Sequence, residues 1–171
     1  ILFVGDKSWF PNQEAGNFLI HELMPIIRKV NTNVKLYIVG KNPSQDLLDL
    51  SEKLHDVIVT GRVESIDPYY KKCDIFINSI YSGSGLNIKL IEALSKGIPV
   101  ITSKFGCRGL PEDQNCMMIY EDLEDLSKKI LYLLDNPSVR KRMSKNAEVY
   151  INNNLKPNDE VNRVLCIGAD T

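Results

Sequence analysis

The sequence has 171 residues, of which 43% are hydrophobic and 25% charged, a composition typical of one globular domain with a single core. The formal net charge is only −1, so no overall field favours nucleic acid or an anionic membrane as a partner. The four cysteines lack metal-ligand spacing, and no apolar run is long enough to span a membrane. We therefore expect a reduced, cytoplasmic protein without a Cys/His metal site.

Short apolar runs rich in β-branched residues alternate with helical periodicity along the chain. Most of these runs are apolar nearly throughout, which is typical of parallel strands buried on both faces. They predict six strands: Ile1–Gly5, Val34–Gly40, Val57–Gly61, Asp74–Ile80, Pro99–Ser103 and Met117–Tyr120.

Helical patterns follow most of the strands. Asn12 is a good N-cap for the first helix, and Pro25 should kink or split it. Asp67 as the cap and Pro68 as the first helical residue open the third. The repeated units predict an α/β fold with a doubly wound, mostly parallel Rossmann-like sheet of about six strands. The predicted helices run from Asn12 to Val30, over Ser44–Leu54, from Asp67, over 86–96, from Glu121 to before Asn136, and from Pro137 to Asn152.

One domain is predicted for residues 1–171, with a core of βα units over 1–152 and a tail over 153–171. The tail is polar at first and is expected to hold a short helix near Asn158–Leu165. The chain also begins abruptly at a predicted strand, and we expect it to be a piece of a longer protein.

The first strand-to-helix turn reads VGDKSWFPN and is a candidate site, because ligands of doubly wound sheets bind beyond the carboxyl ends of the strands. Gly5 is its single glycine, whereas an NAD-dependent dehydrogenase would have G-x-G-x-x-G. Asp6 suggests a phospho-accepting receiver domain, but the third predicted strand ends without the acceptor Asp. Lys7 is the cation of this turn that could reach an anion. Trp9 and Phe10 either plug the end of the sheet, which we favour, or contact a ligand.

The fourth turn, INSIYSGSGLNIKLIEA, passes from a buried strand through small residues into a helix. Gly83 and Gly85 permit positive φ and close backbone approach. The N–H groups near Gly85, Leu86 and Asn87 are expected at the mouth of that helix, where unpaired donors can hold a phosphate.

Lys89 and Glu92 lie three residues apart on one face of the same helix. They could form an ordinary surface pair worth a few tenths of a kcal/mol. Alternatively, Glu92 lies roughly 10 Å from the mouth at ~1.5 Å per residue, where its carboxylate could accept hydrogen bonds from a ribose. The spacing alone leaves both interpretations open.

Residues 82–102, SGSGLNIKLIEALSKGIPVIT, resemble the donor-site motif of retaining GT-B glycosyltransferases of the group 1 type. The resemblance continues through VKLYIVGKNP, VIVTGRVESIDPYYKKCDIFINSI, GIPVITSKFGCRGL and LYLLDNPSVRKRMSKNA, and covers about residues 1–152. It implies the C-terminal, nucleotide-sugar-binding half of a GT-B fold, preceded in the whole protein by an acceptor-binding domain.

The resemblance also implies roles for individual residues. Glu92 stands at the second acid of the family's Glu-x7-Glu motif and is expected to bind the ribose hydroxyls. Ser84 replaces the first acid, which usually contacts the donor sugar, so the sugar is not assigned. Gly83, Gly85 and Leu86 belong to the expected diphosphate cradle. Asn87 and Lys89 are expected to serve the diphosphate.

The same resemblance implies two further contacts. Gly5 and Lys7 lie in the turn where the family neutralises the leaving diphosphate. The loop Gly61–Glu64 is where the family holds the base through backbone groups and an apolar side chain, here Val63. Arg62 either faces the nucleotide or is solvated.

The implied function is transfer of a sugar from a nucleoside diphosphate to an acceptor hydroxyl with retention, without a metal, in surface polysaccharide biosynthesis. The expected partners are the nucleotide sugar and the N-terminal acceptor domain of the same protein, without nucleic acid, and that domain could bring the protein to the inner face of the membrane. The fragment alone is expected to bind its donor without turnover. Two alternatives stay open: a degenerate, non-catalytic nucleotide-binding or scaffolding domain, and another GT-B-shaped sugar-nucleotide enzyme such as a 2-epimerase.

Overall fold

The structure is a computed structural model that describes residues 1–83, 86–113 and 115–154. Two residues of the predicted donor site, Ser84 and Gly85, and the predicted tail helix lie outside the described residues. The strands are β1 (Leu2–Val4), β2 (Leu36–Val39), β3 (Val57–Val59), β4 (Phe76–Asn78), β5 (Val100–Ser103) and β6 (Met117–Tyr120). The helices are α1 (Phe10–Phe18), the π-helical turn η1 (Leu19–Leu23), α2 (Met24–Val30), α3 (Gln45–Lys53), α4 (Asp67–Lys72), α5 (Ile88–Ser95), α6 (Leu123–Asp135) and α7 (Pro137–Asn154).

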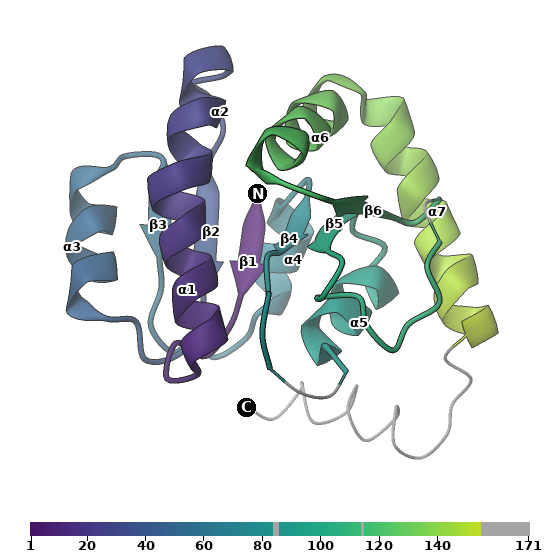
Figure 1. Cartoon of the computed structure of the whole chain (residues 1–171), viewed down its shortest axis with the longest axis horizontal. Helices are drawn as coiled ribbons and strands as arrows, with labels where there is room; N and C mark the ends of the chain where they lie inside the picture. The colour runs from purple at the N-terminus through teal and green to yellow at the C-terminus, as the bar shows by residue number, and fades with distance from the viewer. Residues whose placement is uncertain (84–85, 114, 155–171) are drawn as a thin grey trace.

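The six strands form one sheet in the order β3-β2-β1-β4-β5-β6, and every strand pair is parallel. This confirms the predicted α/β fold with a doubly wound sheet. The chain winds outward from β1 to β3 in one direction and, after crossing back to β4, outward to β6 in the other (Figure 1). The switch point lies between β1 and β4, where Leu2 pairs with Phe76. In open α/β sheets this is the place where ligands bind.

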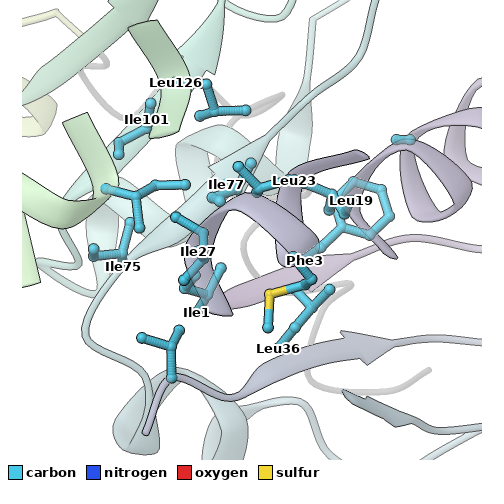
Figure 2. Packing of buried hydrophobic residues seen from close by; sticks show 14 of the residues in the cluster. Ile1, Phe3, Leu19, Leu23, Ile27, Leu36, Ile75, Ile77, Ile101 and Leu126 are labelled. Atoms are coloured by element: carbon cyan, nitrogen blue, oxygen red, sulfur yellow. The ribbon is translucent and has the colours of Figure 1, made fainter. Parts of the chain in front are cut away.

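Both faces of the sheet are covered, as the nearly continuous apolar strands predict. Successive strand residues alternate between two cores: Phe3 belongs to the core under α1, η1, α2 and α6, whereas Leu2 and Val4 belong to the core under α4, α5 and the end of α7. No helix among the described residues is long and apolar enough to cross a membrane. Figure 2 shows the first core, in which strand side chains meet those of the helices: Ile1, Phe3, Leu36, Ile75, Ile77, Ile101, Leu19, Leu23, Ile27 and Leu126.

The first helix begins earlier than predicted, and Pro25 splits it as expected. Trp9, not Asn12, is the N-cap residue, and Asn12 is buried in the first turns of α1. Pro25 lacks the N–H that an α-helix would use four residues back, and the turn before it is the π-helical η1, closed by the Met24 N–H on the Leu19 carbonyl.

Two other helix starts are corrected. α4 begins at Asp67 itself, after Ile66 as its N-cap residue, so Asp67 does not cap the helix. α5 begins at Ile88, two residues later than predicted, because the Asn87 side chain accepts a hydrogen bond from the Leu90 N–H and so caps the helix.

Candidate functional site: a pocket at the switch point of the sheet

A pocket of about 190 Å³ opens at the carboxyl edge of the sheet, above the switch point between β1 and β4. The turn after β1, the loop between β4 and α5, the first residues of α5 and the loop after β5 all contribute to it. Its lining residues are Val4, Trp9, Asn12, Asn78, Ile80, Ser82, Gly83, Leu86, Asn87, Ile88, Lys89, Phe105 and Gly106.

Two glycines at or beside the pocket have side chains of other residues packed closely against their backbone. Gly83 has a φ of +118°, and a Cβ there would lie 2.5 Å from Cζ2 of Trp9, so both backbone conformation and space require glycine. Gly5 has no room for a side chain either, because a Cβ would lie 2.6 Å from the Asn12 amide carbon. That amide donates a hydrogen bond to the Asp6 carbonyl at 2.8 Å and fixes the first turn against α1.

A buried amide network fixes the start of α5. Asn87 Nδ2 donates to Asn78 Oδ1 at 2.8 Å, and Asn78 Nδ2 donates to Thr102 Oγ1 and to the Gly106 carbonyl, both at 3.1 Å. Asn87 Oδ1 in turn accepts from the Leu90 N–H at 3.3 Å. The network therefore joins the ends of β4 and β5, the loop after β5 and the mouth of α5 into one rigid unit.

Two lysines bring positive charge to this edge without a carboxylate in direct contact. Neither Lys7 nor Lys89 forms an ion pair within 4.0 Å in the part of the chain that the structure describes. Lys89 lines the pocket, and burial lowers its pKa while the carboxylates of Asp6 and Glu92 partly oppose that shift.

Lys7 lies beneath the first turn and is only 3% exposed. Its Nζ donates to the Gly5 carbonyl at 2.5 Å and to the Val39 carbonyl at 3.5 Å. Burial, and secondarily the charge of Lys89, lower its pKa from 10.5 to about 8. The side chain is turned inward and does not line the pocket.

Glu92 lies one turn further along α5 and is half-buried. Its Oε2 accepts a hydrogen bond from the buried Tyr70 hydroxyl of α4 at 3.2 Å. Burial raises the pKa of Glu92, while the Tyr70 hydrogen bond and the Lys96 charge oppose the rise. The described residues show no ion pair between Glu92 and Lys89, so the ordinary surface pair is not what the structure contains. In that same part of the chain, no three His, Cys, Asp or Glu residues gather into a metal-binding group.

The sequence profile of the family described as "Glycosyl transferases group 1" matches residues 1–136. The chain belongs to the group 1 glycosyltransferase family. It is 25% identical over 162 residues to an uncharacterized 44.6 kDa protein in the cps region of Klebsiella pneumoniae, covering 90% of this chain and 42% of that protein. It is 30% identical over 125 residues to the alpha-monoglucosyldiacylglycerol synthase of Acholeplasma laidlawii, covering 68% and 31%. The chain thus spans less than half the length of these curated relatives.

Solved structures show the same fold at low identity. The C-terminal domain of the group 1 glycosyl transferase LpcC from Francisella tularensis has a TM-score of 0.70 at 17% identity, covering 92% of this chain and 86% of that one. Anabaena HepE, solved with UDP and glucose, has a TM-score of 0.73 at 14% identity, covering 96% and 47%. The family match and the LpcC domain confirm that the chain has the fold of the C-terminal half of a GT-B glycosyltransferase.

The structure places four of the residues predicted for the donor site of this group 1 domain in the pocket. Gly83, Leu86, Asn87 and Lys89 line one pocket, with Glu92 one turn beyond Lys89 on the same helix. Because α5 starts at Ile88, the first-turn N–H groups are those of Ile88 and Lys89 rather than of Gly85, Leu86 and Asn87, which corrects the predicted mouth of the helix.

Five predicted residues that the structure describes do not line the pocket: Gly5, Lys7, Glu92, Arg62 and Val63. Arg62 and Val63 lie in the loop between β3 and α4 and do not line it. Arg62 is exposed, whereas Val63 packs against the core under α4 and α5.

The sequence interpretation missed several pocket residues. Asn78 is a polar residue at the end of an apolar buried strand, a signal that could have identified it. Phe105, which lines the pocket, and Tyr70, which contacts Glu92 outside it, carried no such signal, because their positions relative to α5 depend on the packing of the loop after β5 and of α4. Trp9 lines the pocket and Phe10 is exposed, so neither simply plugs the end of the sheet.

Proposed function

We propose that this chain is the donor-binding domain of a glycosyltransferase and binds a nucleoside diphosphate sugar at the pocket. The observation that carries the proposal is the arrangement along α5. Asn87 caps the helix, Lys89 lines the pocket, and Glu92 presents a half-buried carboxylate one turn later. An anion site and a hydroxyl acceptor therefore follow each other at the spacing of a diphosphate and its ribose.

The diphosphate is expected at the N-terminus of α5. The first-turn N–H groups of a helix have no intrahelical partner, and the helix dipole favours an anion there. Lys89 supplies a full charge from the pocket wall, and Lys7 adds a second from beneath the first turn. These groups would also stabilise the charge that develops on the leaving diphosphate, so the proposed reaction needs no metal.

Glu92 is the proposed ribose ligand. A carboxylate can accept two hydrogen bonds from neighbouring hydroxyls, and Tyr70 holds Oε2 in place for this. The base is then expected toward the loop of Arg62 and Val63, which follows β3 at the same edge of the sheet.

The whole protein is proposed to move the sugar to an acceptor hydroxyl with retention, in the synthesis of a surface polysaccharide. The relative in the cps region of Klebsiella pneumoniae supports a polysaccharide role, and HepE with UDP and glucose supports a nucleotide-sugar donor. We further propose that an N-terminal domain binds the acceptor and supplies the remaining catalytic groups, so that this chain alone binds its donor without turnover.

Thermal unfolding of the 171-residue chain with UDP, GDP, ADP, CMP and dTDP tests the binding site. A ligand at 100 times its Kd stabilises the folded state by ~2.7 kcal/mol, so one nucleotide should raise the melting temperature by several degrees. Stabilisation by none of the five would contradict the proposal.

Substitutions on α5 then locate the site. Glu92→Gln should weaken the stabilising nucleotide by about 30-fold, because two charge-assisted hydrogen bonds become weaker neutral ones. Lys89→Met should weaken it at least as much. Glu148→Gln and Lys145→Met, both exposed on α7, are the matched controls and should leave affinity unchanged. Equal nucleotide affinities of Glu92→Gln and its control would show that Glu92 does not bind the nucleotide.

Ser84, which replaces the first acid of the family motif, favours a second candidate function, a non-catalytic nucleotide-binding domain. The two candidates differ in one measurement. If the whole protein binds the nucleotide sugar but neither transfers nor hydrolyses its sugar, the second candidate is correct.

A further inference from the structure

Two aromatic rings bound the pocket from different loops. Trp9 comes from the turn after β1, and Phe105 comes from the loop after β5. Asn12, Asn78 and Asn87 also line the pocket, and the Nδ2 groups of Asn12 and Asn87 each make one hydrogen bond within the protein, so each keeps one N–H for a ligand beside the apolar ring faces.

Both rings are held against the same backbone unit. The six-membered ring of Trp9 packs on Gly83, where a Cβ would lie 2.5 Å from Cζ2 and 2.7 Å from Cη2. The Arg108 guanidinium lies 3.5 Å from the centre of the Phe105 ring and donates a hydrogen bond from Nη2 to the Gly83 carbonyl at 3.1 Å. The indole is nonetheless 43% exposed, so packing on Gly83 leaves much of it open.

The size of the pocket limits what it can hold. Small-molecule sites usually measure ~300 to 1,000 Å³, and this pocket is about 190 Å³. That volume is suited to one sugar ring, while the ribose of the proposed donor would lie outside the pocket, toward Glu92 on α5. A pyranose presents apolar C–H groups on its ring face and hydroxyls at its edge, which match aromatic faces and amides respectively.

We infer that Trp9 is a specificity-determining residue that stacks on the ring of the donor sugar in this pocket. The inference rests on the proposed function, because the sugar reaches this pocket attached to a diphosphate held by α5 and Lys89. Trp9 is the single tryptophan of the 171 residues, so tryptophan fluorescence reports on this residue alone.

Intrinsic fluorescence is the first test. The chain is titrated with the nucleoside diphosphate that stabilises it most and with the hexose conjugates of that nucleotide, with tryptophan excited selectively over tyrosine. The matching conjugate should quench or shift the Trp9 emission, whereas the diphosphate alone should bind with little change. Equal emission changes for both ligands would place Trp9 against the nucleotide and overturn the inference.

Affinity measurements on variants are the second test. Trp9→Ala should weaken the sugar nucleotide by about tenfold and the free diphosphate by less than about twofold, since an aromatic contact of this kind is worth about that factor. Trp9→Phe keeps a ring and should lie between Trp9→Ala and the wild type, which guards against a folding defect in the alanine variant. Equal losses for both ligands would make Trp9 a structural support of the Gly83 loop instead. If the wild type binds neither ligand, the proposed function itself fails and the inference fails with it.

Discussion

Lys7 is a buried cation. A substitution can separate the loss of folding stability caused by its charge from its contribution to nucleotide binding. Lys7 is 3% exposed, and its Nζ donates to the carbonyls of Gly5 and Val39 and lies 5.2 Å from the centre of the Phe3 ring. A charge buried without a carboxylate destabilises the folded state unless an anion binds nearby. Lys7→Met keeps the length and apolar stem of the side chain and removes the charge.

The pKa of Lys7 gives the magnitude. A fall from 10.5 to about 8 corresponds to a cost of about 3 kcal/mol for keeping the lysine charged in the folded state at neutral pH, at ~1.36 kcal/mol per factor of ten. Lys7→Met removes this cost but leaves the Gly5 carbonyl without its donor, which costs about 1 to 2 kcal/mol. We therefore expect a net stabilisation of about 1 to 2 kcal/mol at neutral pH.

The gain should disappear at high pH. Because the folded pKa lies below the unfolded one, the penalty in the wild type is fully present below about pH 8 and is lost as the pH rises toward 10.5. Above about pH 10.5 the wild-type lysine is neutral and no longer carries this penalty, whereas the variant still lacks a donor for the Gly5 carbonyl. Lys7→Met should then be the less stable protein. The difference in unfolding free energy between the two proteins should therefore change by about 3 kcal/mol and reverse its sign.

Urea denaturation across this pH range, followed by circular dichroism, measures the difference. Burial raises the pKa of Cys73 to about 11 and of Cys116 to about 12, so both proteins lose stability in alkali. That loss cancels in the difference, and Lys145→Met, an exposed control, should show no pH-dependent difference. A difference for Lys7→Met that stays constant with pH would refute the reasoning. The same variant should also gain less stability from the bound nucleotide than the wild type does.

Two further substitutions test how the site is supported. Asn78→Ala removes a buried amide that donates to Thr102 and Gly106, and should lower the unfolding free energy by about 2 to 3 kcal/mol, seen as a lower urea midpoint at unchanged m-value. Tyr70→Phe removes the hydrogen bond that opposes the rise in the Glu92 pKa, so this pKa should rise further. The loss of nucleotide affinity on acidification should then begin at a higher pH than in the wild type, as a pH titration of binding would show; an unchanged midpoint would contradict the assigned role.

The architecture was predictable because the burial of each strand is reflected in its local amino-acid composition. Strands buried on both faces must be apolar throughout, and all six were predicted within two residues at each end, from Leu2–Val4 to Met117–Tyr120. Helix starts were less predictable, because a cap depends on which side chain reaches the backbone. Asn87 was expected inside the helix mouth and instead caps α5. Asn12 was expected to cap α1 and instead packs its amide on Gly5.

The candidate site was predictable only where one segment carries it. Gly83, Asn87, Lys89 and Glu92 follow one another along a single loop and helix, so their spacing alone placed them together. Phe105 enters from another strand, and its place in the pocket depends on three-dimensional packing that local sequence does not encode.

Described residues on either side of Ser84 and Gly85, between β4 and α5, are held by hydrogen bonds from several parts of the chain. Tyr81 is hydrogen-bonded to Tyr120 at the end of β6, with 2.6 Å between the hydroxyl oxygens. Arg108 then holds the Gly83 carbonyl, and Asn78 holds Asn87. Tyr81, Gly83 and Asn87, held in this way, lose little conformational freedom when a ligand binds, so more of the energy of their contacts appears as affinity. The same ties explain why glycine is needed at residue 83: the backbone there must adopt a positive φ between fixed points, under the ring of Trp9.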